Sequence, residues 1–77
     1  MSQFDGILEV LSKHGFGLEN LVDTKGQTEA LLIKPCLGLS KYLTVPLACD
    51  HIADSAIRQI MQSAGVAEED YKHLLSQ

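Results

Sequence analysis

Few side chains in this 77-residue chain could do acid–base or metal chemistry, and one short stretch brings several of them together. The string CDHIAD places His51 close to Cys49, Asp50 and Asp54. Histidine titrates near neutral pH without perturbation, so His51 is a candidate for proton transfer. Asp50 or Asp54 equally suits the N-cap of a following helix, which is the simpler interpretation of this stretch.

The other histidines and the cysteines have structural explanations. His14 lies at the predicted end of a helix, where a cation interacts favourably with the helix dipole, and His73 is expected on the exposed side of the last helix. Cys36 and Cys49 have no nearby Cys or His pair and therefore do not form a zinc pattern. We predict two free thiols on small, buried or half-buried residues, and no metal or cofactor.

A Lys-Gly pair opens the string KGQTEALLIK, at Lys25 and Gly26. Such a pair before a strand can be a bare turn, or it can hold a reacting group over a substrate. The next residues, Gln27 and Thr28, are poor candidates for acid or base, because neither side chain titrates near neutral pH. The turn alone therefore does not indicate catalysis.

The charge distribution bears on nucleic-acid binding. The net charge of −4 disfavours a general polyanion binder, although the middle of the chain carries Lys25, Lys34 and Lys41. Three lysines are more often a solvated strand face than a footprint for RNA. Tyr42 could stack on a base beside them, or it could pack across a hairpin.

Length and composition predict a single domain over residues 1–77. Domains this small bury only about 60% of their unfolded surface, so a homodimer or a protein partner is an expected source of stability. No apolar run reaches the roughly 18 residues of a membrane span, and the start MSQFDG resembles no secretion signal. We expect a cytoplasmic protein without membrane association.

Helical periodicity is clear at both ends of the chain. Phe4, Ile7, Leu8 and Leu11 form one apolar stripe over residues 3 to 14, and Gly15 is a typical helix end. From Asp50 onward an apolar face returns with helical spacing, ends at Gly65, and is followed by a short helix over residues 68 to 75. The residues of that second face are Ile52, Ala53, Ala56, Ile57, Ile60, Met61 and Ala64.

Three strands are predicted between these helices. Residues 15 to 23 place Phe16, Leu18 and Leu21 as the inward set, and the runs TEALLIKP and KYLTVPLA form a hairpin around Gly38. That hairpin puts the two cysteines roughly 30 Å apart at about 3.3 Å per residue, too far for a disulfide. The predicted fold class is α+β: a three-stranded antiparallel sheet with helices on one face, in the order α-β-β-β-α-α.

The element order and four strings resemble the HicA or YcfA-like family, small toxins of bacterial toxin–antitoxin pairs. The strings are HGFGL after the first helix, the Lys-Gly turn, TVP at residues 44 to 46, and IRQIMQSAGVAEEDYKHLL at residues 57 to 75. The resemblance implies a fold like the double-stranded RNA-binding domain. It also implies cleavage of messenger RNA by a histidine after the first strand, at a site that the antitoxin covers.

In this sequence the position of that histidine is occupied by Thr28, with Gln27 where the family has serine. A threonine hydroxyl is too weak an acid or base to replace an imidazole, and general acid–base catalysis contributes about 10²- to 10⁴-fold in rate. The leading hypothesis is therefore a non-catalytic domain that binds a protein partner or itself. Two alternatives are an RNase whose catalytic group has moved to His51, and shape-selective RNA binding without cleavage.

Overall fold

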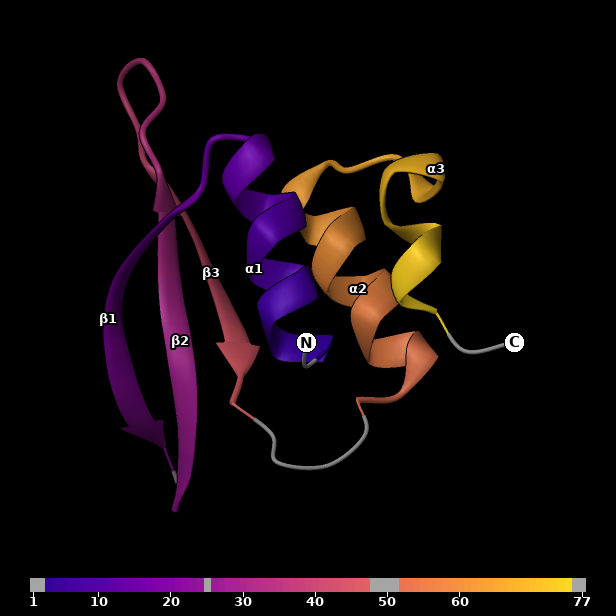
Figure 1. Ribbon diagram of the computed structural model, residues 1–77. Helices are drawn as coiled ribbons and strands as arrows, with labels where there is room; N and C mark the ends of the chain where they lie inside the picture. Colours follow the sequence, from indigo (N-terminus) through magenta and orange to yellow (C-terminus); the bar gives the residue numbers. More distant parts are fainter. Residues whose placement is uncertain (1–2, 25, 48–51, 76–77) are drawn as a thin grey trace.

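Three antiparallel strands form one sheet, and the helices lie on one side of it (Figure 1). The computed structural model describes residues 3–24, 26–47 and 52–75. The predicted α+β class and the order α-β-β-β-α-α are confirmed. The elements are α1 (Gln3–Lys13), β1 (Gly17–Thr24), β2 (Gln27–Lys34), β3 (Lys41–Pro46), α2 (Asp54–Ala64), α3 (Glu68–Tyr71) and the 3₁₀ turn η1 (Lys72–Leu74).

The strands pair in chain order, β1-β2-β3, so that β2 is central and both other strands are edges. Gly26, at φ 79°, forms the first turn, and Gly38, at φ 82°, lies in the connection between β2 and β3, where the hairpin was predicted. Positive φ is costly for other residues and explains the glycines at these turns. Short connections of this kind require antiparallel neighbours.

The core lies between the sheet and the first two helices. The central strand contributes Ala30 and Leu32, which are almost fully buried, and β3 contributes Val45. The apolar stripes of α1 and α2 face these residues, with Ile7 and Ile57 completely buried. The helical periodicity seen in the sequence therefore corresponds to the buried faces of the helices.

The C-terminal helix packs on the other helices rather than on the sheet. Tyr71 of α3 is only 2% exposed, and Leu74 of η1 packs against the core cluster. Arg58 of α2 donates a hydrogen bond to Glu68 of α3. This bond, together with the charge of the carboxylate, raises the pKa of Arg58 above its ordinary value.

Only the C-terminal end of α2 matches the sequence prediction. Gly65 ends the helix in the left-handed conformation, as expected, and its N–H contacts the carbonyls of Gln62 and Met61. The predicted N-cap is wrong for Asp54, because Ala53 occupies that position without a side-chain bond and Asp54 is the first helical residue. Asp50 lies outside the described residues. The segment before α2 is instead held by the amide of Gln3, which accepts from the Ile52 N–H at 2.7 Å.

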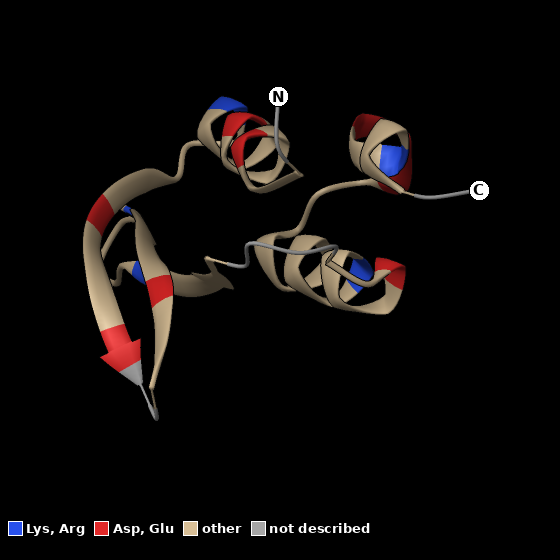
Figure 2. Cartoon of the chain, turned by 60° about the horizontal axis from the view of Figure 1, so that its bottom comes forward, with Lys and Arg blue, Asp and Glu red and all other residues tan. Residues whose placement is uncertain are grey.

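The prediction for the interior of β1 is only partly right. Phe16, just before the strand, is buried, but Leu18 and Leu21 are 58% and 53% exposed. Their Cα partners are the buried Leu32 and Ala30, so both leucines lie on the helix side of the sheet. They are exposed because β1 is the strand farthest from α2 and α3 (Figure 2).

Within the described ranges, no helix is long and apolar enough to cross a membrane.

Candidate functional site

The Lys-Gly turn carries a structural hydrogen bond at the position where the resemblance places catalysis. The Thr28 hydroxyl donates to the Asp23 carboxylate at 2.7 Å, and these two residues are Cα partners across β1 and β2. Gln27 is exposed beside them, and Lys25 lies outside the described residues. The Thr28 side chain thus helps to close the turn between β1 and β2.

Neither described histidine is near Thr28. His14 follows α1, and its Nε2 lies 3.6 Å from the Asp70 carboxylate of α3. A methyl group added at the neighbouring Gly15 would lie 3.4 Å from the Lys34 side chain, so His14 is near the end of β2 opposite to Thr28. Thr28 and Lys34 are six positions apart along β2, which corresponds to roughly 20 Å at about 3.3 Å per residue. His73 is exposed on η1, as expected, and His51 lies outside the described residues.

The candidate RNA-binding residues do not form one surface. Lys34 and Lys41 are Cα partners, whereas the neighbouring Tyr42 pairs with Ile33 and so points to the opposite face of the sheet. The Lys34 ammonium lies 5.8 Å from the centre of the Phe16 ring, which orients it along the sheet. Among the described residues, β1 carries acidic side chains and no basic ones, and the basic residues form no continuous stripe over the strands and helices (Figure 2).

Metal binding and cysteine chemistry gain no support. Within residues 3–24, 26–47 and 52–75 there is no group of three or more metal-binding side chains. Cys36 is a free thiol but is exposed, which corrects the expectation of a buried or half-buried residue. It lies in the connection between β2 and β3, outside the reach of the core. Cys49 lies outside the described residues.

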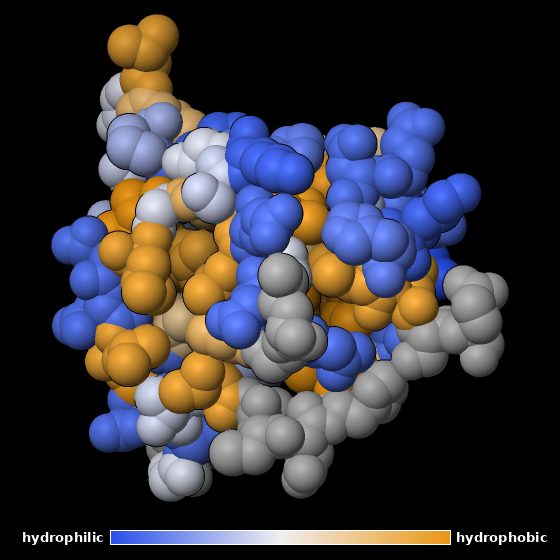
Figure 3. All heavy atoms as spheres, in the orientation of Figure 1, coloured by the Kyte–Doolittle hydropathy of each residue, from blue (hydrophilic) through white to orange (hydrophobic). Residues whose placement is uncertain are grey.

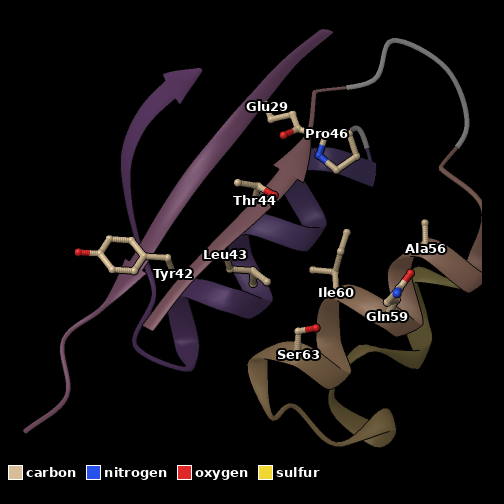
Figure 4. A pocket seen from close by; sticks show the side chains of 9 residues that line it. All are labelled: Glu29, Tyr42, Leu43, Thr44, Pro46, Ala56, Gln59, Ile60 and Ser63. Carbon is tan, nitrogen blue, oxygen red and sulfur yellow. The ribbon is translucent and has the colours of Figure 1, made fainter. Parts of the chain in front are cut away.

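A groove of about 530 Å³ runs between β3 and α2 (Figure 4). Leu43 from the strand and Ile60 from the helix point toward each other across it, and Tyr42 points away (Figure 4). Glu29 and Pro46 lie at one end. The residues that line it are Glu29, Tyr42, Leu43, Thr44, Pro46, Ala56, Gln59, Ile60 and Ser63.

The backbone of β3 is open along this groove. The Leu47 N–H donates to the Thr28 carbonyl at 2.9 Å, so this pair is a hydrogen-bonded pair of the antiparallel ladder. Because such pairs alternate, Val45 and Leu43 also point their backbone groups toward β2. Tyr42, Thr44 and Pro46 then point theirs toward the free edge. Sequence reasoning identified Tyr42 for a different purpose and missed the groove, since only the packing of α2 beside β3 creates it.

Large apolar side chains are exposed on this small domain. Figure 3 shows hydrophobic atoms gathered over the sheet between β1 and α1, and again at the tip of the β2–β3 connection. Leu37 and Leu39 at that tip are almost completely exposed. The full set of large exposed apolar residues is Leu18, Leu21, Leu37, Leu39, Tyr42 and Leu47.

The described residues thus place an open strand edge beside a partly apolar groove, and they bring no imidazole to the Lys-Gly turn. Exposed apolar residues surround the sheet on several sides. Neither protein-family models, nor curated proteins, nor solved structures give a match to this chain.

Proposed function

We propose that this chain is a non-catalytic, HicA-like domain that works by binding another protein chain, either a different partner or a second copy. The observation that carries the proposal is the exposure of six large apolar side chains, between 40% and 106%, on a domain of 77 residues. Exposed apolar patches on soluble domains commonly mark interaction sites.

The energetics favour such an association. Burying an exposed leucine stabilises by up to about 1.5–3 kcal/mol, so covering even three of these residues offsets a substantial part of the cost of association. A small domain with a limited core gains correspondingly in stability from a partner. The exposed leucines lie on β1, in the β2–β3 connection and just after β3 rather than on the helices, so the strands and their connections are the expected contact surface.

The chemistry at the turn supports binding over catalysis. RNA cleavage through the 2′-hydroxyl needs a group that both takes and gives protons near neutral pH. The Thr28 hydroxyl does not titrate there and is already engaged by Asp23. The net charge of −4 also gives no general attraction for the phosphate backbone.

The proposal is tested by light scattering at micromolar concentrations together with quantitative affinity capture from the native host cell. We expect either a dimer or a stoichiometric complex with one recovered protein. As a matched pair, Tyr42→Ser with Leu47→Ser should weaken the association, whereas the exposed control Gln62→Ser should not. A chain that stays monomeric and recovers no protein above background contradicts the proposal, as does degradation of RNA by the purified chain.

A further inference from the structure

We infer that the free edge of β3 and its groove bind an extended segment of a partner protein, which joins the sheet as a fourth strand. The inference rests on the proposed function and specifies the contact edge and the chemistry of the partner segment. Three independent features of the described residues support it: open backbone groups, a partly apolar groove on one face, and a single charged residue in the groove lining.

The backbone groups define a short docking window. Tyr42 and Thr44 each direct an N–H and a carbonyl toward the free edge, by the alternation that the Leu47–Thr28 bond fixes. Pro46 falls at the next outward position, where its missing N–H removes nothing from the pairing with β2. A partner strand can therefore exchange about four hydrogen bonds with Tyr42 and Thr44 and a fifth with the Pro46 carbonyl.

The two edges of the sheet, β1 and β3, are not equally suited to pairing with an added strand. The pairing of β1 shifts register between Leu18 and Asn20, and such bulges disrupt regular pairing at an edge. The pairing of β3 is continuous from Lys41 to Pro46. A straight, regular edge is the better template for strand addition.

The groove supplies contacts for alternate side chains of the added strand. Side chains that point toward α2 would lie over Leu43, Ile60 and Ala56, with Gln59 and Ser63 along the helix side. The volume of about 530 Å³ falls within the roughly 300–1,000 Å³ typical of sites for small ligands, so the groove suits a few residues of one strand.

The charge of the groove lining predicts one further property of the partner segment. Glu29 is the charged member of the groove lining, and it lies at the Pro46 end (Figure 4). It shares the outer face with Pro46, its Cα partner. The partner segment should therefore alternate apolar residues, facing α2, with polar residues on the outer face. One of these, a Lys or Arg next to Pro46, would reach across β3 toward Glu29.

The test uses synthetic peptides and isotope-labelled protein. The probe is acetyl-TVKVTVT-amide, titrated while the backbone amide signals are followed by NMR. We expect a submillimolar dissociation constant and shifts concentrated on Tyr42, Thr44 and the groove side of α2. Replacing the peptide lysine by glutamate should weaken binding about five-fold, the scale of an exposed ion pair. Equal binding of the two peptides overturns the assigned role of Glu29.

Backbone N-methylation of the peptide separates strand addition from simple side-chain contact. In a strand, alternate N–H groups face β3, so methylating one set should abolish binding while methylating the other set should leave it within about three-fold. Equal effects of the two sets overturn the inference. On the protein, Gln59→Lys should weaken binding of the lysine probe, whereas Gln62→Lys, exposed on the same helix outside the groove, should not.

The outcomes distinguish this inference from the proposed function. If the light-scattering and capture experiments give a complex but Gln59→Lys leaves that complex and the probe unaffected, the edge assignment is wrong and the binding function stands. If the wild-type chain forms a dimer that Gln59→Lys disrupts, the edge belongs to a second copy and the inference of a partner segment is overturned. If no association of any kind is measured, both fail.

Discussion

The hydrogen bond between Thr28 and Asp23 separates a structural from a catalytic role for the Lys-Gly turn. Thr28→Val removes the hydroxyl and keeps a β-branched side chain, so the strand preference of the residue is nearly unchanged. The bond measures 2.7 Å and lies at the surface. A hydrogen bond of this kind contributes about 0.5–1.5 kcal/mol, and solvent exposure places this one near 1 kcal/mol.

Urea unfolding followed by circular dichroism measures this loss of stability. The melting temperature should fall by about 4–8 °C for each kcal/mol lost in a domain of this size. Asp23→Asn should cost less than Thr28→Val, because an amide oxygen still accepts the bond. In a double-mutant cycle the two changes should be coupled, since they share one interaction. If Thr28→Val leaves stability unchanged and abolishes an RNA-cleaving activity of the wild-type chain, the structural interpretation is refuted.

Three further predictions address the core, a helix end and RNA. Ile57→Ala should cost about 2–5 kcal/mol in urea unfolding, because Ile57 is completely buried and leaves a cavity, while the exposed Gln62→Ala should change little. Gly65→Ala should lower the free energy of unfolding by about 1–2 kcal/mol, because alanine is strained at φ 76° while its added methyl group meets no neighbour. A smaller loss in the same measurement would contradict this explanation. Duplex RNA should bind weakly in fluorescence anisotropy, with little change for Lys34→Glu plus Lys41→Glu; tight binding with a logarithmic salt slope near −2 or steeper would restore the RNA-binding hypothesis.

The helices and the hairpin could be predicted because local patterns decide them. The stripe that includes Ile7 and Leu11 in α1, and the face that includes Ile57 in α2, are the surfaces that the structure buries. Gly38 and Gly65 mark a turn and a helix end because positive φ is costly for other residues. These signals depend on a few neighbouring residues, and distant packing does not change them.

The interior of β1 could not be predicted, because burial there depends on how far the helices reach. Leu18 and Leu21 have the correct spacing and lie on the helix side of the sheet, yet they stay exposed because β1 is the strand farthest from α2 and α3 (Figure 2). The register shift near Leu18 likewise leaves no signal in the sequence. Alternation predicts which face a side chain takes, whereas exposure depends on tertiary coverage.

The candidate site likewise combines features that local sequence predicts with features that depend on tertiary packing. The sequence shows that Thr28 occupies the position where the resemblance places a histidine, and the structure adds the partner, Asp23, that gives the hydroxyl a structural role. That Lys41 and Tyr42 lie on opposite faces follows from the period of a strand and could have been predicted. The groove could not, because Leu43 and Ile60 are far apart in the chain and meet only when α2 packs beside β3.

The ends of β3 explain how an open edge can be tolerated without aggregation. Exposed edges with long, regular pairing invite open-ended association, and proteins limit it with lysine, proline and short strands. Here Lys41 lies exposed at one end and Pro46 at the other, so only Tyr42 and Thr44 offer both a donor and an acceptor between them. A window that short gives too few bonds for stable pairing unless the groove contributes side-chain contacts as well. Selectivity for one partner segment would therefore come from Leu43, Ile60 and their neighbours, and the backbone would contribute direction and register.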